Sequence, residues 1–245
     1  MIATNSIVRI AAIGALATAS LSALAQEDPK RIFVFGDSLT WGWTPVEPIV
    51  PTVRHAHEDR WTTALAEALG DGYELVVNGL SGRTTNIDDP TDAKLNGAEM
   101  FPALLAAHEP LDLVIIMLGT NDTKTYLQRT PFEIGLGAGH LINMVHEAPG
   151  WDWTDYPAPQ VLLISPPPLG QEIDPLAAEI FEGSLEKSRA LPQVYEAIAA
   201  AAGESFFDAG SVISTDGVDG IHFTAETNQT LGEAVADEVK TIFKQ

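Results

Sequence analysis

The sequence predicts an α/β fold in which a parallel β-sheet is covered by helices on both faces. Short runs of β-branched and aromatic residues alternate along the chain with longer segments of helical spacing, an order typical of parallel strands joined by crossover helices. The strand runs are almost continuously apolar, as strands buried on both faces must be. A length of 245 residues suits one such domain, or at most two small ones.

The expected elements follow in order along the chain. The first strand covers residues 31–35 and stops at Gly36, where a loop begins. Four further strands are expected, at residues 74–77, 111–118, 160–164 and 205–207. Helical spacing predicts helices at residues 61–69, 98–108, 131–147, 176–202 and 225–243. Proline-rich stretches at residues 44–51 and 148–159 have no clear period and are expected to be surface excursions.

The N-terminus has the features of a secretory signal peptide. Arg9 precedes a short apolar run that closes on Ala23-Leu-Ala25, before the polar Gln26. The run is short and interrupted by threonine and serine, which argues against an uncleaved membrane anchor. We therefore expect residues 1–25 to be removed after Ala25, and residues 26–245 to form one domain that is secreted or periplasmic, without stable membrane insertion.

Composition excludes several classes of function. The chain has 34 acidic and 13 basic side chains, a formal net charge of −21, which argues against nucleic-acid binding because such partners need a basic surface. The absence of cysteine excludes disulfides, thiolate catalysis and cysteine-based zinc sites. At 45% apolar and 19% charged residues, the composition is not that of a disordered chain.

The loops at the strand ends carry the groups of a nucleophilic acyl-transfer site. Ligands of open α/β sheets bind beyond the carboxyl ends of the strands. Ser38 lies two residues after Gly36, at the end of the first strand, and Asp219 and His222 lie three residues apart near the end of the chain. A serine needs a histidine to accept its proton, and that histidine needs an acceptor on its other nitrogen. The spacing permits Asp219 to be that acceptor.

An acyl-transfer site also needs fixed donors for the oxyanion. Three candidates lie in these loops: the backbone N–H of Gly82, the side-chain amide of Asn121 and the backbone N–H of Ser38.

Four blocks of the sequence carry a family resemblance. They are Phe35-Gly-Asp-Ser-Leu-Thr-Trp-Gly42, Gly79-Leu-Ser-Gly82, Gly119-Thr-Asn-Asp122 and Asp219-Gly-Ile-His222. In this order they resemble the four signatures of the SGNH (GDSL-type) hydrolases. Residues 84–92, 111–124, 165–169 and 207–224 are similar to the mycobacterial arylesterase and acyltransferase branch, also known for perhydrolase activity. Gly82 departs from that branch, in which alanine is expected.

The resemblance implies a flavodoxin-like three-layer α/β/α fold and a serine esterase without metal or cofactor. Ser38 would attack the ester carbonyl, His222 would take its proton and Asp219 would orient His222. Ser38, Gly82 and Asn121 would hold the oxyanion, and water, an alcohol or hydrogen peroxide would resolve the acyl-enzyme.

The same resemblance implies the shape of the substrate site and an assembly. Trp43, Ile180, Phe181 and Ile221 would line a pocket for small acyl esters. A small apolar pocket excludes water, so that transfer to an alcohol competes with hydrolysis. A high-order homo-oligomer is also implied, with the insert at residues 43–61 narrowing the entrance.

Other interpretations of these residues remain open at the level of sequence. Asp208 and Asp216 are alternative partners for His222, and Asp37 suits a turn-stabilising role. His55 and His57, with two neighbouring carboxylates, could form a metal site, but no strand is expected there to align them. Trp151 and Trp153 suit either a subunit contact or a platform for sugars. The rival functions are a carbohydrate deacetylase of the acetylxylan type with the same fold, and a catalytically silent binding protein.

Overall fold

The computed structural model describes residues 28–148 and 154–244. Within them, five parallel strands form one sheet in the order β2-β1-β3-β4-β5. The strands are β1 (Lys30–Gly36), β2 (Tyr73–Gly79), β3 (Leu113–Met117), β4 (Gln160–Ser165) and β5 (Ser205–Asp208). The signal peptide expected at residues 1–25 lies outside this part of the chain. Inside it, no helix combines the length and the hydropathy needed to cross a bilayer.

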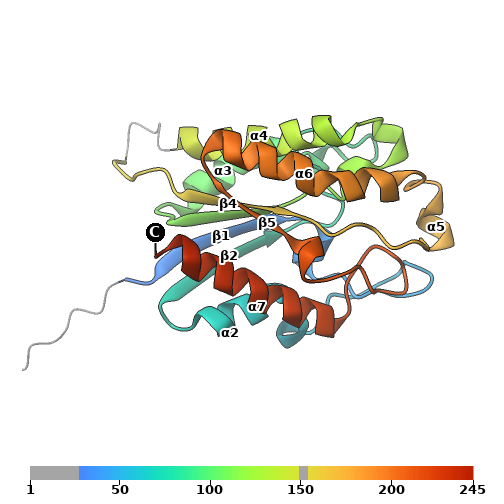
Figure 1. The fold of residues 1–245 in the computed structure, drawn as a ribbon, viewed down its shortest axis with the longest axis horizontal. Coiled ribbons are helices and arrows are strands. Elements are labelled where there is room, and N and C mark those ends of the chain that lie inside the picture. Colours follow the sequence, from blue (N-terminus) through green and yellow to red (C-terminus); the bar gives the residue numbers. More distant parts are fainter. Residues whose placement is uncertain (1–27, 149–153, 245) are drawn as a thin grey trace, which may run out of the picture.

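Helices cover both faces of the sheet, as Figure 1 shows. Helices α2 (Trp61–Leu69) and α7 (Ala225–Ile242) lie on one face, and α3 (Gly97–His108), α4 (Pro131–Glu147) and α6 (Ser184–Ala202) lie on the other. Successive side chains of a strand point to opposite faces. Ile32 and Val34 of β1 accordingly belong to the core with α2 and α7, whereas Phe33 and Phe35 belong to the core with α3, α4 and α6. The predicted three-layer α/β/α fold is confirmed.

The strand order places a switch point at the carboxyl end of β1. Strand β2 pairs with one side of β1 and β3 with the other, and Gly36 at the end of β1 is in register with both Gly79 and Met117. The chain leaves β1 and β3 toward opposite halves of the sheet, and such a switch point opens a crevice for ligands. The short helix α1 (Ser38–Trp41) and the 3₁₀ turn η3 (Asn121–Thr123) both begin at this crevice.

The prediction of a single helix over residues 176–202 is wrong. The chain forms a short helix α5 (Pro175–Ala178), turns, and starts α6 only at Ser184. Gly183 has a φ of 71° and precedes α6 in the left-handed region, which glycine adopts without steric cost. The turn buries Phe181 against Leu169, Ala177 and Ile221. Tertiary packing of one phenyl ring therefore interrupts a segment whose spacing is helical throughout.

A close approach between α2 and α7 yields a stability prediction. A Cβ on Gly232 of α7 would lie 2.3 Å from the carbonyl oxygen of Trp61 and 2.8 Å from the backbone nitrogen of Leu65. These are backbone atoms, so the two helices must separate to admit it. Gly232→Ala should lower the free energy of unfolding by about 2 kcal/mol, as overpacking does, measured by urea denaturation. Gly72→Ala is the matched control, because nothing lies within 4 Å of its added Cβ; equal effects of the two substitutions would contradict the prediction.

Candidate active site

Ser38 is the first residue of α1 and is separated from the end of β1 only by Asp37. Asp37 caps this helix, because its Oδ1 accepts a hydrogen bond of 2.9 Å from the backbone N–H of Leu39. The helix ends after one turn at Gly42, which has a φ of 90° and donates its N–H to the carbonyl of Ser38. The turn holds the Ser38 side chain, which is mostly buried, at the edge of a cavity.

Asp219 fixes His222 through both of its carboxylate oxygens. Oδ1 accepts hydrogen bonds from the backbone N–H groups of Ile221 and His222, each 2.9 Å long. Oδ2 accepts from Nδ1 of the His222 ring at 2.8 Å. Gly220, with a φ of 71°, permits the tight turn between them. One carboxylate therefore sets the backbone, the ring orientation and the tautomer of the histidine.

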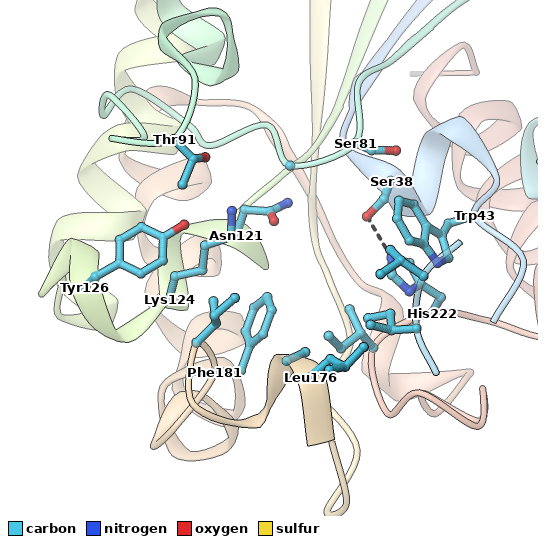
Figure 2. A pocket seen from close by; sticks show the side chains of 16 residues that line it. Ser38, Trp43, Ser81, Thr91, Asn121, Lys124, Tyr126, Leu176, Phe181 and His222 are labelled. Atoms are coloured by element: carbon cyan, nitrogen blue, oxygen red, sulfur yellow. Dashed lines mark hydrogen bonds between the residues drawn. The ribbon is translucent and has the colours of Figure 1, made fainter. Parts of the chain in front are cut away.

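The second nitrogen of His222 faces the serine. Its Nε2 lies 2.9 Å from Oγ of Ser38 (Figure 2). Because Nδ1 donates to a carboxylate, Nε2 is the acceptor in the neutral ring, and the Ser38 hydroxyl donates to it. The Trp43 ring stacks on the imidazole at a centroid distance of 4.8 Å and an interplanar angle of 11°. The structure thus brings together the three residues that the sequence nominated for nucleophile, base and orienting carboxylate.

Burial and the carboxylate act in opposite directions on this pair. Burial lowers the pKa of His222 below its ordinary 6.5, although the hydrogen bond and the charge of Asp219 partly oppose this. For Asp219, burial would raise the pKa, but the hydrogen bonds from His222 and Ile221 outweigh it and the pKa is lowered. At neutral pH the imidazole is therefore unprotonated and the carboxylate ionised, which is the protonation state that a general base requires.

The three expected oxyanion donors also meet at this cavity. Ser38, Gly82 and Asn121 all line it. Gly82 has a φ of 90°, so that a side chain there would be strained. The Asn121 amide is held from behind, because its Nδ2 donates a 3.2 Å hydrogen bond to Oδ2 of Asp37. An amide nitrogen has two protons, and the second one remains for a ligand in the cavity.

Asp37 is a buried acid behind the site, and its turn-stabilising interpretation is supported by the cap on α1. Burial raises its pKa to about 7, against the lowering effects of its hydrogen bonds and of the nearby Arg83. The Arg83 guanidinium donates to the carbonyls of Gly36 and Asn78, joining the ends of β1 and β2. Burial lowers the pKa of Arg83 to about 10, so it stays protonated.

The cavity has a volume of about 400 Å³ and two chemically different walls. Trp43, Ile180, Phe181 and Ile221, the residues expected to form the pocket, all line it. Further apolar lining residues are Ile49, Val50, Leu176 and Ala177. The insert at residues 43–61 is held at the cavity by a hydrogen bond of 2.9 Å. The backbone N–H of Ile49 donates it to Asp174, the cap of α5.

A second part of the cavity lining was missed by reasoning from sequence. It is polar and is formed by Thr91, Lys124 and Tyr126, which Figure 2 shows across the cavity from Ser38 and His222. Lys124 and Tyr126 follow closely after Asn121, and Thr91 lies in one of the blocks that carry the family resemblance. The positions of Thr91 and Lys124 in those blocks were a usable signal, whereas Tyr126 lies just outside them.

The alternative partners for His222 are engaged elsewhere. Asp208 accepts the backbone N–H of Gly210, and Asp216 accepts from Thr224 and Thr227 at the start of α7. Burial raises the pKa of Asp208. Burial opposes ionisation of Asp216 as well, but the hydrogen bonds that Asp216 accepts from Thr224 and Thr227 outweigh it and lower its pKa.

The histidines of the suggested metal site also have other partners. His55 contacts the carbonyl of Phe223 through Nε2, and His57 contacts Oγ1 of Thr63. Across residues 28–148 and 154–244, no three His, Cys, Asp or Glu side chains are grouped as a metal ion would need.

The fold and the site together define the class of protein. The SGNH hydrolases have a parallel sheet between two layers of helices. In them a serine contacts a histidine beyond the carboxyl ends of the strands. The profile of the GDSL-like Lipase/Acylhydrolase family matches residues 34–230. The chain belongs to this family, which makes it a carboxylic ester hydrolase by class and confirms the resemblance recognised in its sequence.

Solved structures of known esterases are similar to almost the whole described chain. The aryl esterase of M. smegmatis is 57% identical, with a TM-score of 0.85 over 86% of this chain and 99% of that one. Est24, a carbohydrate acetylesterase from Sinorhizobium meliloti, is 54% identical, with a TM-score of 0.85 over 87% and 99%. A second carbohydrate acetylesterase family member from S. meliloti is 36% identical, with a TM-score of 0.79 over 88% and 100%. No curated protein sequence matches the chain significantly.

The raised pKa of Asp37 predicts a pH dependence of stability. Because the folded-state pKa of about 7 exceeds the unfolded value of about 3.9, the folded state binds more protons between these values. The contribution of Asp37 to stability therefore falls as pH rises from about 4 to about 7. Asp37→Asn keeps an oxygen for the Leu39 N–H but does not titrate. Its unfolding free energy, relative to the unsubstituted protein, should rise across this pH range in urea titrations.

The matched control is Asp237→Asn, which removes the same charge from an 86% exposed side chain. Its stability difference from the unsubstituted protein should stay nearly flat between pH 4 and pH 7. A stability difference for Asp37→Asn that is also independent of pH would contradict the raised pKa of the Asp37 carboxyl.

Proposed function

We propose that the protein is a serine esterase for short-chain acyl esters, with Ser38 as nucleophile, His222 as general base and Asp219 as the residue that orients it. The observation that carries the proposal is the chain of hydrogen bonds from Ser38 Oγ through His222 to Asp219, of 2.9 and 2.8 Å. These lengths lie within the range for a base that abstracts a proton directly. The family and the two esterases at 54% and 57% identity support the same reaction.

In the first half-reaction, Oγ of Ser38 attacks the ester carbonyl while Nε2 of His222 takes its proton. The carbonyl π electrons move to oxygen, and the oxyanion is bound by the backbone N–H groups of Ser38 and Gly82 and by the amide of Asn121. The imidazolium that forms is stabilised by Asp219. Collapse of the intermediate breaks the bond to the alcohol oxygen, which leaves with the proton held on Nε2.

In the second half-reaction, an acceptor attacks the carbonyl carbon of the acyl-enzyme while Nε2 of His222 takes its proton. The bond from that carbon to Oγ of Ser38 then breaks, and Oγ receives the proton from Nε2. Water gives the carboxylic acid, an alcohol gives a new ester and hydrogen peroxide gives a peracid. We propose acyltransferase and perhydrolase capacity in addition to hydrolysis. The apolar lining supports this, because Phe181 and Ile221, which are almost fully buried, line the same cavity as Ser38 and offer no polar side-chain group to order water there.

Deacetylation of carbohydrates is the second candidate function. The polar wall of Thr91, Lys124 and Tyr126 favours it, as does the 54% identity to a carbohydrate acetylesterase. The tryptophans that suggested sugar stacking, Trp151 and Trp153, lie outside the described residues. Comparing acetylated xylan with an aryl acetate separates the two substrates, and a silent binding protein would turn over neither.

Two properties of the whole protein are further proposals. The N-terminal sequence supports secretion or export to the periplasm after cleavage at Ala25. A high-order homo-oligomer is supported by apolar side chains exposed around the cavity mouth, with Val50 48% and Leu176 61% exposed. Exposed apolar surface of this kind is common at subunit contacts.

Hydrolysis of p-nitrophenyl acetate tests the function directly. The mature protein should release p-nitrophenol, and with benzyl alcohol present chromatography should detect benzyl acetate. Ser38→Ala should lower turnover by roughly 10⁶-fold, as loss of a catalytic serine does, and should escape labelling by a fluorophosphonate. Release of p-nitrophenol with acetate and no benzyl acetate would support the esterase activity and contradict the acyltransferase activity. A folded, fully active Ser38→Ala protein would contradict the assignment of Ser38 as the nucleophile.

The lowered pKa of His222 predicts the acidic limb of the pH profile. Protonated His222 cannot accept the Ser38 proton, so that kcat/KM should fall as pH decreases through the pKa of this ring. Because burial lowers that pKa, the midpoint should lie below 6.5. The profile of kcat/KM for p-nitrophenyl acetate reports the free enzyme, and a midpoint above 6.5 would mean that the imidazole is less buried or more strongly paired.

A further inference from the structure

The polar wall of the cavity is organised around one buried carboxylate. Asp89 is 2% exposed and accepts four hydrogen bonds. Oδ1 binds the backbone N–H and the hydroxyl of Thr91, at 2.9 and 2.6 Å. Oδ2 binds Nζ of Lys124 and the hydroxyl of Tyr126, both at 2.9 Å. Burial opposes ionisation of Asp89, but these hydrogen bonds overcome it and lower its pKa to about 2. The wall is therefore a fixed ionic and hydrogen-bonded unit.

The bonds to Asp89 determine what each group has left for a ligand. Tyr126 and Thr91 use their hydroxyl protons on Asp89, so that their oxygens face a ligand only as acceptors. Lys124 has three N–H donors, and among the described residues Asp89 is the acceptor that Nζ reaches. The wall thus offers two acceptors and an ammonium donor at the same end of the cavity. A hydroxyl group, which donates one hydrogen bond and accepts others, matches this set.

The charge of the wall argues for a neutral ligand. The ammonium of Lys124 lies 2.9 Å from the Asp89 carboxylate, and both side chains are largely buried. The pair is neutral overall, and the chain around it carries a net charge of −21. A carboxylate or phosphate on the substrate would meet no uncompensated positive charge here, so that ionic recognition is not what this wall provides.

The wall and the proposed nucleophile share one cavity. Figure 2 shows Thr91, Lys124 and Tyr126 on one side and Ser38, Trp43 and His222 on the other, with Asn121 between them. All seven residues line the same space of about 400 Å³, which is within the range of small-molecule sites. An ester whose carbonyl lies at Ser38 and Asn121 can therefore extend to the polar wall.

We propose that Thr91, Lys124 and Tyr126 form a subsite for a hydroxyl group of a neutral ester substrate. The proposal rests on the proposed esterase function and adds a preference for hydroxylated over plain esters. The hydroxyl belongs either to the alcohol portion or to the acyl portion of the ester, and the same hydrogen bonds recognise both.

Two pairs of matched esters test the subsite. The first pair is 2,3-dihydroxypropyl acetate and propyl acetate, which differ by hydroxyls on the alcohol. The second pair is propyl 3-hydroxybutanoate and propyl butanoate, which differ by a hydroxyl on the acyl chain. For each pair the ratio of kcat/KM values, hydroxylated over plain, is measured in the unsubstituted protein and in variants. Intrinsic differences in reactivity within a pair cancel when the ratios of two proteins are compared.

Tyr126→Phe and Thr91→Val are the test variants, because each removes one acceptor oxygen and leaves the Lys124–Asp89 pair intact. Each should lower the ratio for one ester pair by about fivefold, the effect of one lost hydrogen bond, mainly through a higher KM for the hydroxylated ester. Leu176→Ala is the control on the apolar wall. It should change both esters of a pair alike and leave their ratio unchanged.

The outcomes separate the subsite from the function. A lowered ratio in the first pair assigns the hydroxyl to the alcohol, and one in the second pair assigns it to the acyl chain; either supports the subsite. An active enzyme whose two ratios are unchanged in both variants overturns the subsite and leaves the esterase in place. An unsubstituted protein that hydrolyses none of the four esters or p-nitrophenyl acetate overturns both.

Discussion

The parallel pairing of β1 between β2 and β3 is the constraint on which the site depends. Because all strands run in one direction, every loop that leaves a carboxyl end emerges at the same edge of the sheet. Ser38 follows β1, Gly82 follows β2 and Asn121 follows β3, while His222 lies in the long connection after β5. Strand pairing therefore brings four groups from distant parts of the sequence to the same edge of the sheet. The pairing itself is stabilised by side chains such as Phe33 and Val34, which are fully buried on opposite faces.

Buried carboxylates then convert this convergence into fixed geometry. Asp219 holds the ring of His222, Asp37 holds the Asn121 amide, and Asp89 holds the polar wall. A fourth, Asp122, accepts from Thr85 and forms an ion pair of 2.6 Å with Arg129 behind Asn121. A buried carboxylate without partners is strongly unfavourable. Each of these acids therefore fixes the donors around it, and those donors in turn stabilise the buried acid.

The sequence predicted the parts of this arrangement that follow from local pattern or from known chemistry. Apolar runs located the strands, and the spacing of Asp219 and His222 was sufficient to pair them, since one tight turn joins the two. The break between α5 and α6 could not be predicted, because it depends on Phe181 packing into a cavity formed by distant segments. The hydroxyl of Ser184 at that break binds the carbonyl of Thr123, 61 residues earlier. No local signal encodes such a contact.

The polar wall shows the same limit at the level of function. Lys124 and Asp89 are 35 residues apart, and each by itself is typical of an exposed loop. Their role becomes visible only when the loop after β2 and the turn after β3 meet, so that Asp89 pairs with Lys124 and Lys124 lies across the cavity from the proposed nucleophile. Groups that make and break bonds need particular residue types at short spacing, so a motif reveals them. Groups that select a substrate need only face the same cavity, and many residue types can do so. The reaction class of this chain can therefore be predicted from its sequence more readily than its substrate preference, because the substrate preference is set by how the loops pack together.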